Sequence, residues 1–197
     1  NELKLKDDTI VVYFSDNGPN SYRWNGGMKG RTGSIDEGGL RSPLFVRWPQ
    51  KIRAGLQIAQ VGGAIDLLPT LADRAGVEVS ARKPINGMSL APRLRQVKAD
   101  YPNRSLFSIK LNQVSVRTQR FRLDASGKLF DIAADPGQRN DVSRQHSIET
   151  RRLKEQAARF NRQMQKHFQA NADRPFTVGY GPATTLTARD GVAHGTI

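Results

Sequence analysis

The sequence contains no cysteine among its 197 residues, which excludes disulfide bonds and thiolate metal sites and is compatible with any compartment. No apolar run approaches the roughly 20 residues that a membrane-spanning helix needs. Aromatic residues make up only 7% of the chain, and neither a zinc-finger spacing nor the aromatic and basic pattern of an RNA-binding strand occurs. The sequence therefore argues against nucleic acid as a partner.

Negative charge is also scarce, since 18 acidic residues face 31 basic ones and give a formal net charge of +13. Residues 1–95 hold 14 basic and 9 acidic residues, and the remainder holds 17 and 9, so both parts are basic. Such a surface attracts polyanions over long distances. A solvated, arginine-rich surface without a dedicated polyanion groove is the alternative interpretation.

An uninterrupted apolar run ends in an acid, an amide and a glycine near the start of the chain. Residues 10–14 show no polar alternation, which is typical of a strand whose two faces are both covered, as in a parallel α/β sheet. Asp16 and Asn17 follow, at the strand end where such sheets bind ligands. Their charged and neutral oxygens are ligands that calcium or magnesium prefers. An ordinary turn is the competing interpretation, because Asp, Asn and Gly are common turn residues.

A basic, glycine-rich stretch follows this strand. Six glycines lie between Gly26 and Gly39, and they are surrounded by Arg23, Lys29, Arg31 and Arg41. Glycines let the backbone approach a ligand closely, and the cations favour an oxyanion. A flexible, solvated loop is the alternative.

Several motifs then occur in an order that resembles the C-terminal half of the sulfatase family, from about residue 8 to about residue 170. The matching segments are 15–18, 37–43, 48–49, 65–71, 86–90, 116–123 and 129–142. The resemblance implies an α/β fold: the C-terminal part of an alkaline-phosphatase-like sandwich with a mainly parallel sheet, plus a small antiparallel sheet packed by one amphipathic helix.

The resemblance also implies a chemistry. In sulfatases an Asp-Asn pair, which corresponds to Asp16 and Asn17, helps to hold a calcium ion, and a lysine of the glycine-rich loop contacts the sulfate. That lysine normally lies five residues before the glutamate of Glu-Gly-Gly, and here the position is Thr32. Lys29 lies three residues earlier and is our candidate for the sulfate contact, with Arg31 as the alternative.

The formylglycine nucleophile of the family is made from a Cys/Ser-x-Pro-x-Arg motif, which this sequence lacks. We therefore expect a fragment that is inactive alone, binds calcium weakly and needs a missing N-terminal half. The implied substrate is a sulfate ester or a sulfated glycan, and the implied location is periplasmic or secreted. Two alternatives remain: a related phosphoryl or phosphonate ester hydrolase, and a non-catalytic basic module that binds polyanions.

The change of residue pattern along the chain predicts three parts: residues 1–95 as part of the α/β core, residues 96–170 as a small α+β subdomain, and residues 171–197 as an extended, truncated tail. Short alternating runs predict strands at 106–109, 114–116, 121–123 and 128–131. A helix is expected to begin at Ser147. Its apolar residues recur with helical spacing at Ile148, Leu153, Ala157, Phe160, Met164 and Phe168. A second helix, with Asp66 as its cap and Leu67, Leu68 and Leu71 on its buried face, should end at Gly76.

Overall fold

A computed structural model describes residues 4–21, 24–49, 51–79, 84–95 and 101–170. By its internal contacts the chain divides into two compact units, Asn1–Arg162 and Gln163–Ile197. The predicted tail, 171–197, lies outside the described residues, and the predicted division at residue 95 stays a prediction. The described part of the second unit is the end of one long helix, and everything below concerns the first unit unless stated.

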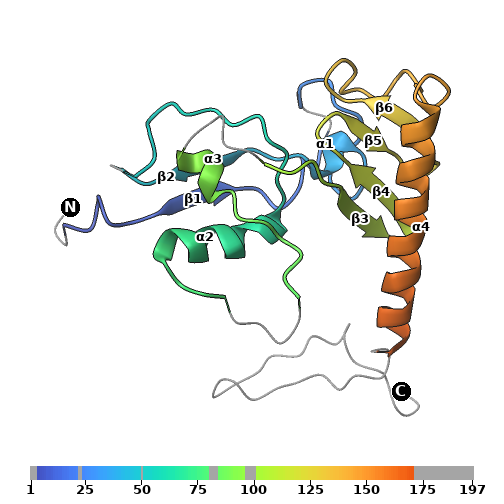
Figure 1. Ribbon diagram of the computed structural model, residues 1–197. Coiled ribbons are helices and arrows are strands. Elements are labelled where there is room, and N and C mark those ends of the chain that lie inside the picture. The colour runs from blue at the N-terminus through green and yellow to red at the C-terminus, as the bar shows by residue number, and fades with distance from the viewer. Residues whose placement is uncertain (1–3, 22–23, 50, 80–83, 96–100, 171–197) are drawn as a thin grey trace, which may run out of the picture. The chain divides into compact units, whose positions relative to one another are not determined.

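A two-stranded sheet and several short helices come first along the chain, and a four-stranded sheet followed by one long helix comes after them (Figure 1). Their bounds are β1 Val11–Phe14, α1 Glu37–Leu40, β2 Leu44–Arg47, a 3-10 turn Ala64–Asp66, α2 Leu67–Ala75, α3 Ala91–Arg95, β3 Leu106–Lys110, β4 Gln113–Arg117, β5 Phe121–Leu123, β6 Leu129–Asp131 and α4 Ser147–Ala170. None of the helices within the described ranges combines the length and the apolar character that a membrane crossing requires.

The strand predicted at residues 10–14 forms as β1, but its pairing differs from the expectation. It pairs antiparallel with β2, with Val11 opposite Arg47 and Phe14 opposite Leu44. Both sheets in the described part of the chain are antiparallel, so the predicted mainly parallel sheet is not observed there. The physical reason is that an uninterrupted apolar run indicates only that both faces of a strand are covered. It does not indicate whether the neighbouring strand is parallel or antiparallel.

The predicted small antiparallel sheet is confirmed. It has four strands in the order β3-β4-β5-β6, so each strand is hydrogen-bonded to its neighbour in sequence. Gly127, in the turn between β5 and β6, has a φ of +80°, a conformation that glycine adopts without strain. The core of the sheet is formed by buried residues of β4, β5, β6 and α4: Val114, Val116, Leu123, Leu129 and Leu153.

Helix α4 covers this sheet through part of its predicted apolar stripe. Leu153 is fully buried, and the ring of Phe160 stacks on that of Phe107 with centroids 4.7 Å apart. Ile148 is 76% exposed, so it lies outside the packed stripe, contrary to the expectation. The predicted amphipathic helix therefore packs on the sheet through residues from Leu153 to Phe160.

Helix α2 ends as predicted, because Gly76 takes the left-handed conformation with φ of +69°. Its buried residues differ from the prediction, since Leu68 is 57% and Leu71 is 38% exposed. Asp66, which precedes the helix, is fully buried, and its side chain makes no cap on the helix. Its carboxylate instead accepts hydrogen bonds from the backbone N–H groups of Gly63 and Met88, each at 2.8 Å.

Candidate active-site segment

The two predicted metal ligands lie next to each other immediately after β1. Asp16 is exposed and Asn17 is half-buried. The Asn17 amide Nδ2 donates a hydrogen bond to the Asp16 Oδ2 at 3.0 Å, so the two side chains meet at one point. Carboxylate and amide oxygens are ligands that a hard cation such as calcium prefers, and here the amide meets the carboxylate through its nitrogen, so its oxygen would face such a cation only after the amide turns over. Across the described residues, no group of three or more His, Cys, Asp or Glu side chains is placed to hold a metal ion.

The backbone on each side of this pair is fixed to α1 and the residue stretch that follows it. The Gly18 N–H donates to the Gly39 carbonyl oxygen at 3.0 Å. The Ser42 hydroxyl donates to the Ser15 carbonyl oxygen at 2.6 Å. A Cβ atom on Gly18 would collide with the Gly38 carbonyl oxygen, so the strand end and α1 approach as closely as two backbones can.

The glycine-rich loop packs on the same place. The Thr32 N–H donates to the Pro19 carbonyl oxygen at 2.9 Å, and the Gly38 N–H donates to the Lys29 carbonyl oxygen at 2.7 Å. A Cβ atom on Gly38 would lie 2.8 Å from that same Lys29 oxygen. These contacts argue against the alternative of a freely solvated loop, because the loop backbone is held against both the strand end and α1.

The candidate sulfate-contacting residues have different partners in the structure. The Lys29 ammonium is 3.3 Å from an Asp36 oxygen and 3.9 Å from an Asp124 oxygen, with its side chain 43% exposed. Thr32, at the usual lysine position, contacts the strand end through its backbone. The Arg31 Nη1 donates to the Asn20 carbonyl oxygen at 3.3 Å. The role of Lys29 in sulfate binding stays a prediction.

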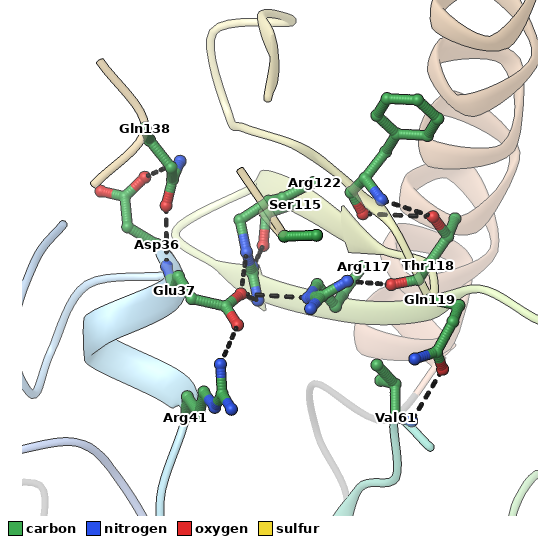
Figure 2. A network of polar contacts seen from close by, with 12 residues as sticks. Asp36, Glu37, Arg41, Val61, Ser115, Arg117, Thr118, Gln119, Arg122 and Gln138 are labelled. Carbon is green, nitrogen blue, oxygen red and sulfur yellow. Dashed lines mark hydrogen bonds and ion pairs between the residues drawn. The ribbon is translucent and has the colours of Figure 1, made fainter. Parts of the chain in front are cut away.

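A buried ionic cluster joins α1 to the four-stranded sheet (Figure 2). Glu37 is 2% exposed. Its Oε2 accepts hydrogen bonds from the Arg122 Nε at 2.9 Å and the Arg117 Nε at 3.1 Å, and Arg41 lies 3.7 Å from its Oε1. Burial lowers the pKa of Arg117, against the attraction of Glu37, which raises it. The Glu37 carboxylate thus offsets part of the positive charge of Arg117, Arg122 and Arg41, which lie close to it.

Gln138 completes the contact at the start of α1. Its Oε1 accepts a hydrogen bond from the Glu37 N–H at 2.9 Å, and its Nε2 donates to the Asp36 Oδ1 at 3.1 Å. One of the unpaired backbone donors at the start of the helix is satisfied in this way. Figure 2 shows Gln138 and the arginines approaching Glu37 from different segments.

Sequence reasoning missed Glu37, Arg117, Arg122 and Gln138 as members of one cluster. A signal was present, because Arg117 and Arg122 lie directly opposite each other on β4 and β5. Like charges at opposed positions are unfavourable unless they share a counterion. A predicted hairpin with two facing arginines therefore predicts a carboxylate from elsewhere in the chain.

Comparison with known proteins places this segment in a family. A sequence model described as Sulfatase matches residues 1–77, which include Asp16, Asn17, Lys29 and Glu37. Steryl-sulfatase of Mus musculus is 36% identical over 104 residues, which are 48% of this chain and 17% of that protein. N-acetylglucosamine-6-O-sulfatase of Bacteroides thetaiotaomicron is 30% identical over 159 residues, which are 69% of this chain and 26% of that protein.

The solved structures agree on the fold. The crystal structure of Ps i-CgsB superposes with a TM-score of 0.70 at 20% identity, over 88% of this chain and 43% of that one. The fold is thus that of an α/β fragment that aligns with part of a larger α/β protein. The chain belongs to the sulfatase family and spans a minor part of the length of the curated relatives that it matches.

Proposed function

We propose that this chain supplies part of the active site of a sulfuric ester hydrolase. The observation that carries the proposal is the Asp16–Asn17 pair, whose side chains meet directly after β1 inside the segment that matches the sulfatase family. Relatives of which this chain spans a part are sulfatases by name, and the residue types at the strand end suit the chemistry that such an enzyme needs.

The Asp16 carboxylate and the carbonyl oxygen of the Asn17 amide would each serve as a calcium ligand. Calcium, when bound, supplies positive charge that neutralises sulfate oxygens and orients the ester. Calcium takes six to eight oxygen ligands, so this pair alone leaves most positions to water or to other residues. The isolated chain should therefore bind calcium weakly. Since the formylglycine motif does not occur in the sequence, we also expect the isolated chain not to turn over substrate.

The glycine-rich loop would provide the cation that faces the sulfate group. Lys29 is the candidate, and its ion pairs with Asp36 and Asp124 are partly exposed, so they are worth little and the side chain can leave them. Arg31 is the alternative, because the next residue, Thr32, donates its backbone N–H to the Pro19 carbonyl oxygen and so keeps Arg31 near the end of β1. A fixed cation there would stabilise the charge that develops during sulfate transfer.

A sulfated glycan is the substrate class that we favour, acted on by a periplasmic or secreted enzyme. One relative of this chain is an N-acetylglucosamine-6-O-sulfatase by name. The net charge of +13 would also attract a polyanionic chain more strongly than a small neutral ester. Both observations support a sulfated saccharide as the first substrate to test.

The test uses the natural protein that contains this chain. Elemental analysis and sulfate release from a chromogenic aryl sulfate and a 6-O-sulfated glucosamine would be measured for the wild type, Asp16→Asn and Asn17→Ala. We expect calcium in the wild type, and loss of both calcium and turnover in the two variants. The control Asp8→Asn, which removes an exposed carboxylate before β1, should change neither.

Three results would contradict the proposal. Unchanged calcium content and turnover in Asp16→Asn would remove the pair from the site. A bound zinc or manganese pair with phosphoester cleavage would instead favour a related phosphoryl or phosphonate ester hydrolase. Salt-sensitive heparin binding without any hydrolysis would favour a non-catalytic polyanion-binding module.

A further inference from the structure

We infer that Arg122, together with Arg117 and Gln138, positions the Asp16–Asn17 pair from the four-stranded sheet, although none of the three touches that pair. The inference rests on the proposed function, since it assigns these residues a role in calcium binding. It is carried by a continuous series of contacts that begins with buried side chains at the sheet and runs through α1 to the more exposed strand end.

The first step joins the sheet to α1. The Arg122 side chain is 4% exposed, and its Nε and Nη2 both lie 2.9 Å from the Glu37 Oε2. Its Nη1 also donates to the Ile35 carbonyl oxygen at 3.0 Å and to the Ser115 hydroxyl at 3.2 Å. The planar guanidinium therefore fixes both the side chain of Glu37 and the backbone that leads into α1, which a lysine ammonium cannot do in the same geometry.

The second step concerns α1 itself. It has four residues, Glu37–Leu40, and two of them are glycines. So short a helix has no stability of its own, and its position depends on tertiary contacts. The contacts that hold its start are those of Glu37 with the two arginines and with Gln138. The sheet therefore determines where α1 lies.

The third step joins α1 to the metal-ligand pair. Gly18 is bonded to Gly39, and Ser15 is bonded to Ser42 just beyond α1. Asp16 and Asn17 lie between these two anchored residues. A Cβ atom does not fit between Gly18 and Gly38, so the two backbones are in direct contact. A displacement of α1 must therefore move the backbone that carries both ligands.

The consequence is chemical, because the affinity for calcium depends on how rigidly the ligands are held. Loss of the buried Arg122 should remove its two contacts with the buried Glu37 carboxylate, leave Arg117 and Arg41 as the remaining counterions, and loosen the start of α1. We expect weaker calcium binding in addition to lower stability. A residue that is only structural would change stability alone.

The experiment compares variants of the natural protein. Arg122→Met removes the charge while keeping much of the length of the side chain, and Arg122→Lys keeps the charge but loses the contact of two guanidinium nitrogens with the Glu37 Oε2. The control is Thr118→Val, since the buried Thr118 hydroxyl exchanges hydrogen bonds with the Phe121 backbone, and the bond that Arg117 donates to the Thr118 carbonyl oxygen involves backbone that the variant keeps. Calcium dissociation constants would be measured by chelator competition, and thermal stability in excess calcium and in chelator.

We expect Arg122→Met to raise the calcium Kd at least tenfold, Arg122→Lys to recover part of the loss, and Thr118→Val to lower Tm with an unchanged Kd. A wild-type Kd in Arg122→Met, at a Tm loss equal to that of the control, would overturn the inference while leaving the proposed function intact. If the wild type binds no calcium, or if Asp16→Asn binds it normally, the proposed function fails and the inference with it.

A milder variant keeps the inference open to refutation if Arg122→Met does not fold. Gln138→Met removes the hydrogen bonds to the Glu37 N–H and to Asp36 without unpairing a charge. It should raise the calcium Kd several-fold, and an unchanged Kd in a folded Gln138→Met protein would overturn the inference.

Discussion

Replacing Asp66 by asparagine should destabilise the fold far more than the same change at Asp73, although both carboxylates pair with an arginine near α2. Asp66 is fully buried, and its ion pair with Arg104 has side chains 0% and 12% exposed. It also accepts the backbone N–H groups of Gly63 and Met88. One carboxylate therefore joins the start of α2, the turn before α3 and the segment that leads into β3.

The magnitude follows from burial. Removing one partner of a buried ion pair leaves an uncompensated charge and typically lowers the free energy of unfolding by about 3–5 kcal/mol. The Asp66→Asn side chain would keep the shape of the carboxylate but present an N–H group to at least one donor. Asp73 pairs with Arg95 at 3.2 Å, with side chains 36% and 59% exposed. Such exposed pairs contribute about 0–1 kcal/mol, so the two variants should differ by roughly 3 kcal/mol.

Urea unfolding of the natural protein, followed by circular dichroism, would measure both free energies of unfolding. The thermal midpoint provides a second readout, and it should fall further for Asp66→Asn than for Asp73→Asn. Asp66→Asn and Asp73→Asn would be compared at the same pH and calcium concentration. Equal losses of stability in the two variants would refute the reasoning, because burial would then not decide the contribution of the carboxylate.

Three further outcomes are expected. Leu153→Ala should lower the free energy of unfolding by about 2–5 kcal/mol in urea titrations, because the side chain is fully buried in the sheet core, and a loss below ~1 kcal/mol would contradict this. Gly18→Ala should force the strand end away from Gly38, lowering stability by about 1–3 kcal/mol and weakening calcium binding in calorimetry; normal binding would disprove the close contact. The Ser143 hydroxyl donates to Asp141 and holds its pKa below the usual 3.8, so this stabilisation is present above pH 3.8 and is lost as the pH falls through the folded-state pKa. Asp141→Asn should therefore flatten the loss of stability in acid titrations, and an unchanged acid profile would count against the assignment.

Local patterns were sufficient for the second half of the chain. Alternation of apolar and polar residues predicted β3 to β6, and helical spacing predicted α4, whose Leu153 lies at the centre of the observed core. These elements pair with sequence neighbours, so their contacts are encoded within a few residues of each other. For the same reason Gly76 was recognisable as the end of α2.

The first half was less predictable because its partners are remote or were inferred from the family. The apolar run of β1 predicted a strand, but not that its observed partner β2 would be antiparallel. Tyr13 remains 66% exposed, although the apolar run at residues 10–14 predicted that both faces of the strand are covered.

Local pattern could indicate only part of the buried cluster at Glu37: the facing Arg117 and Arg122 predict a carboxylate, but Glu37 lies 80 and 85 residues away from them and is not identified by that pattern. The energetics of the cluster nevertheless explain how the two parts of the chain depend on each other. The first part carries the ligand pair on a short strand and a four-residue helix, neither of which has enough local structure to be rigid. The second part has a packed core and places two arginines, opposite each other, where only a carboxylate from outside the sheet can offset their charge. We therefore expect the packed sheet to hold the strand end in place through Glu37, so that substitutions in β5 should weaken the proposed calcium binding at residues that they do not touch.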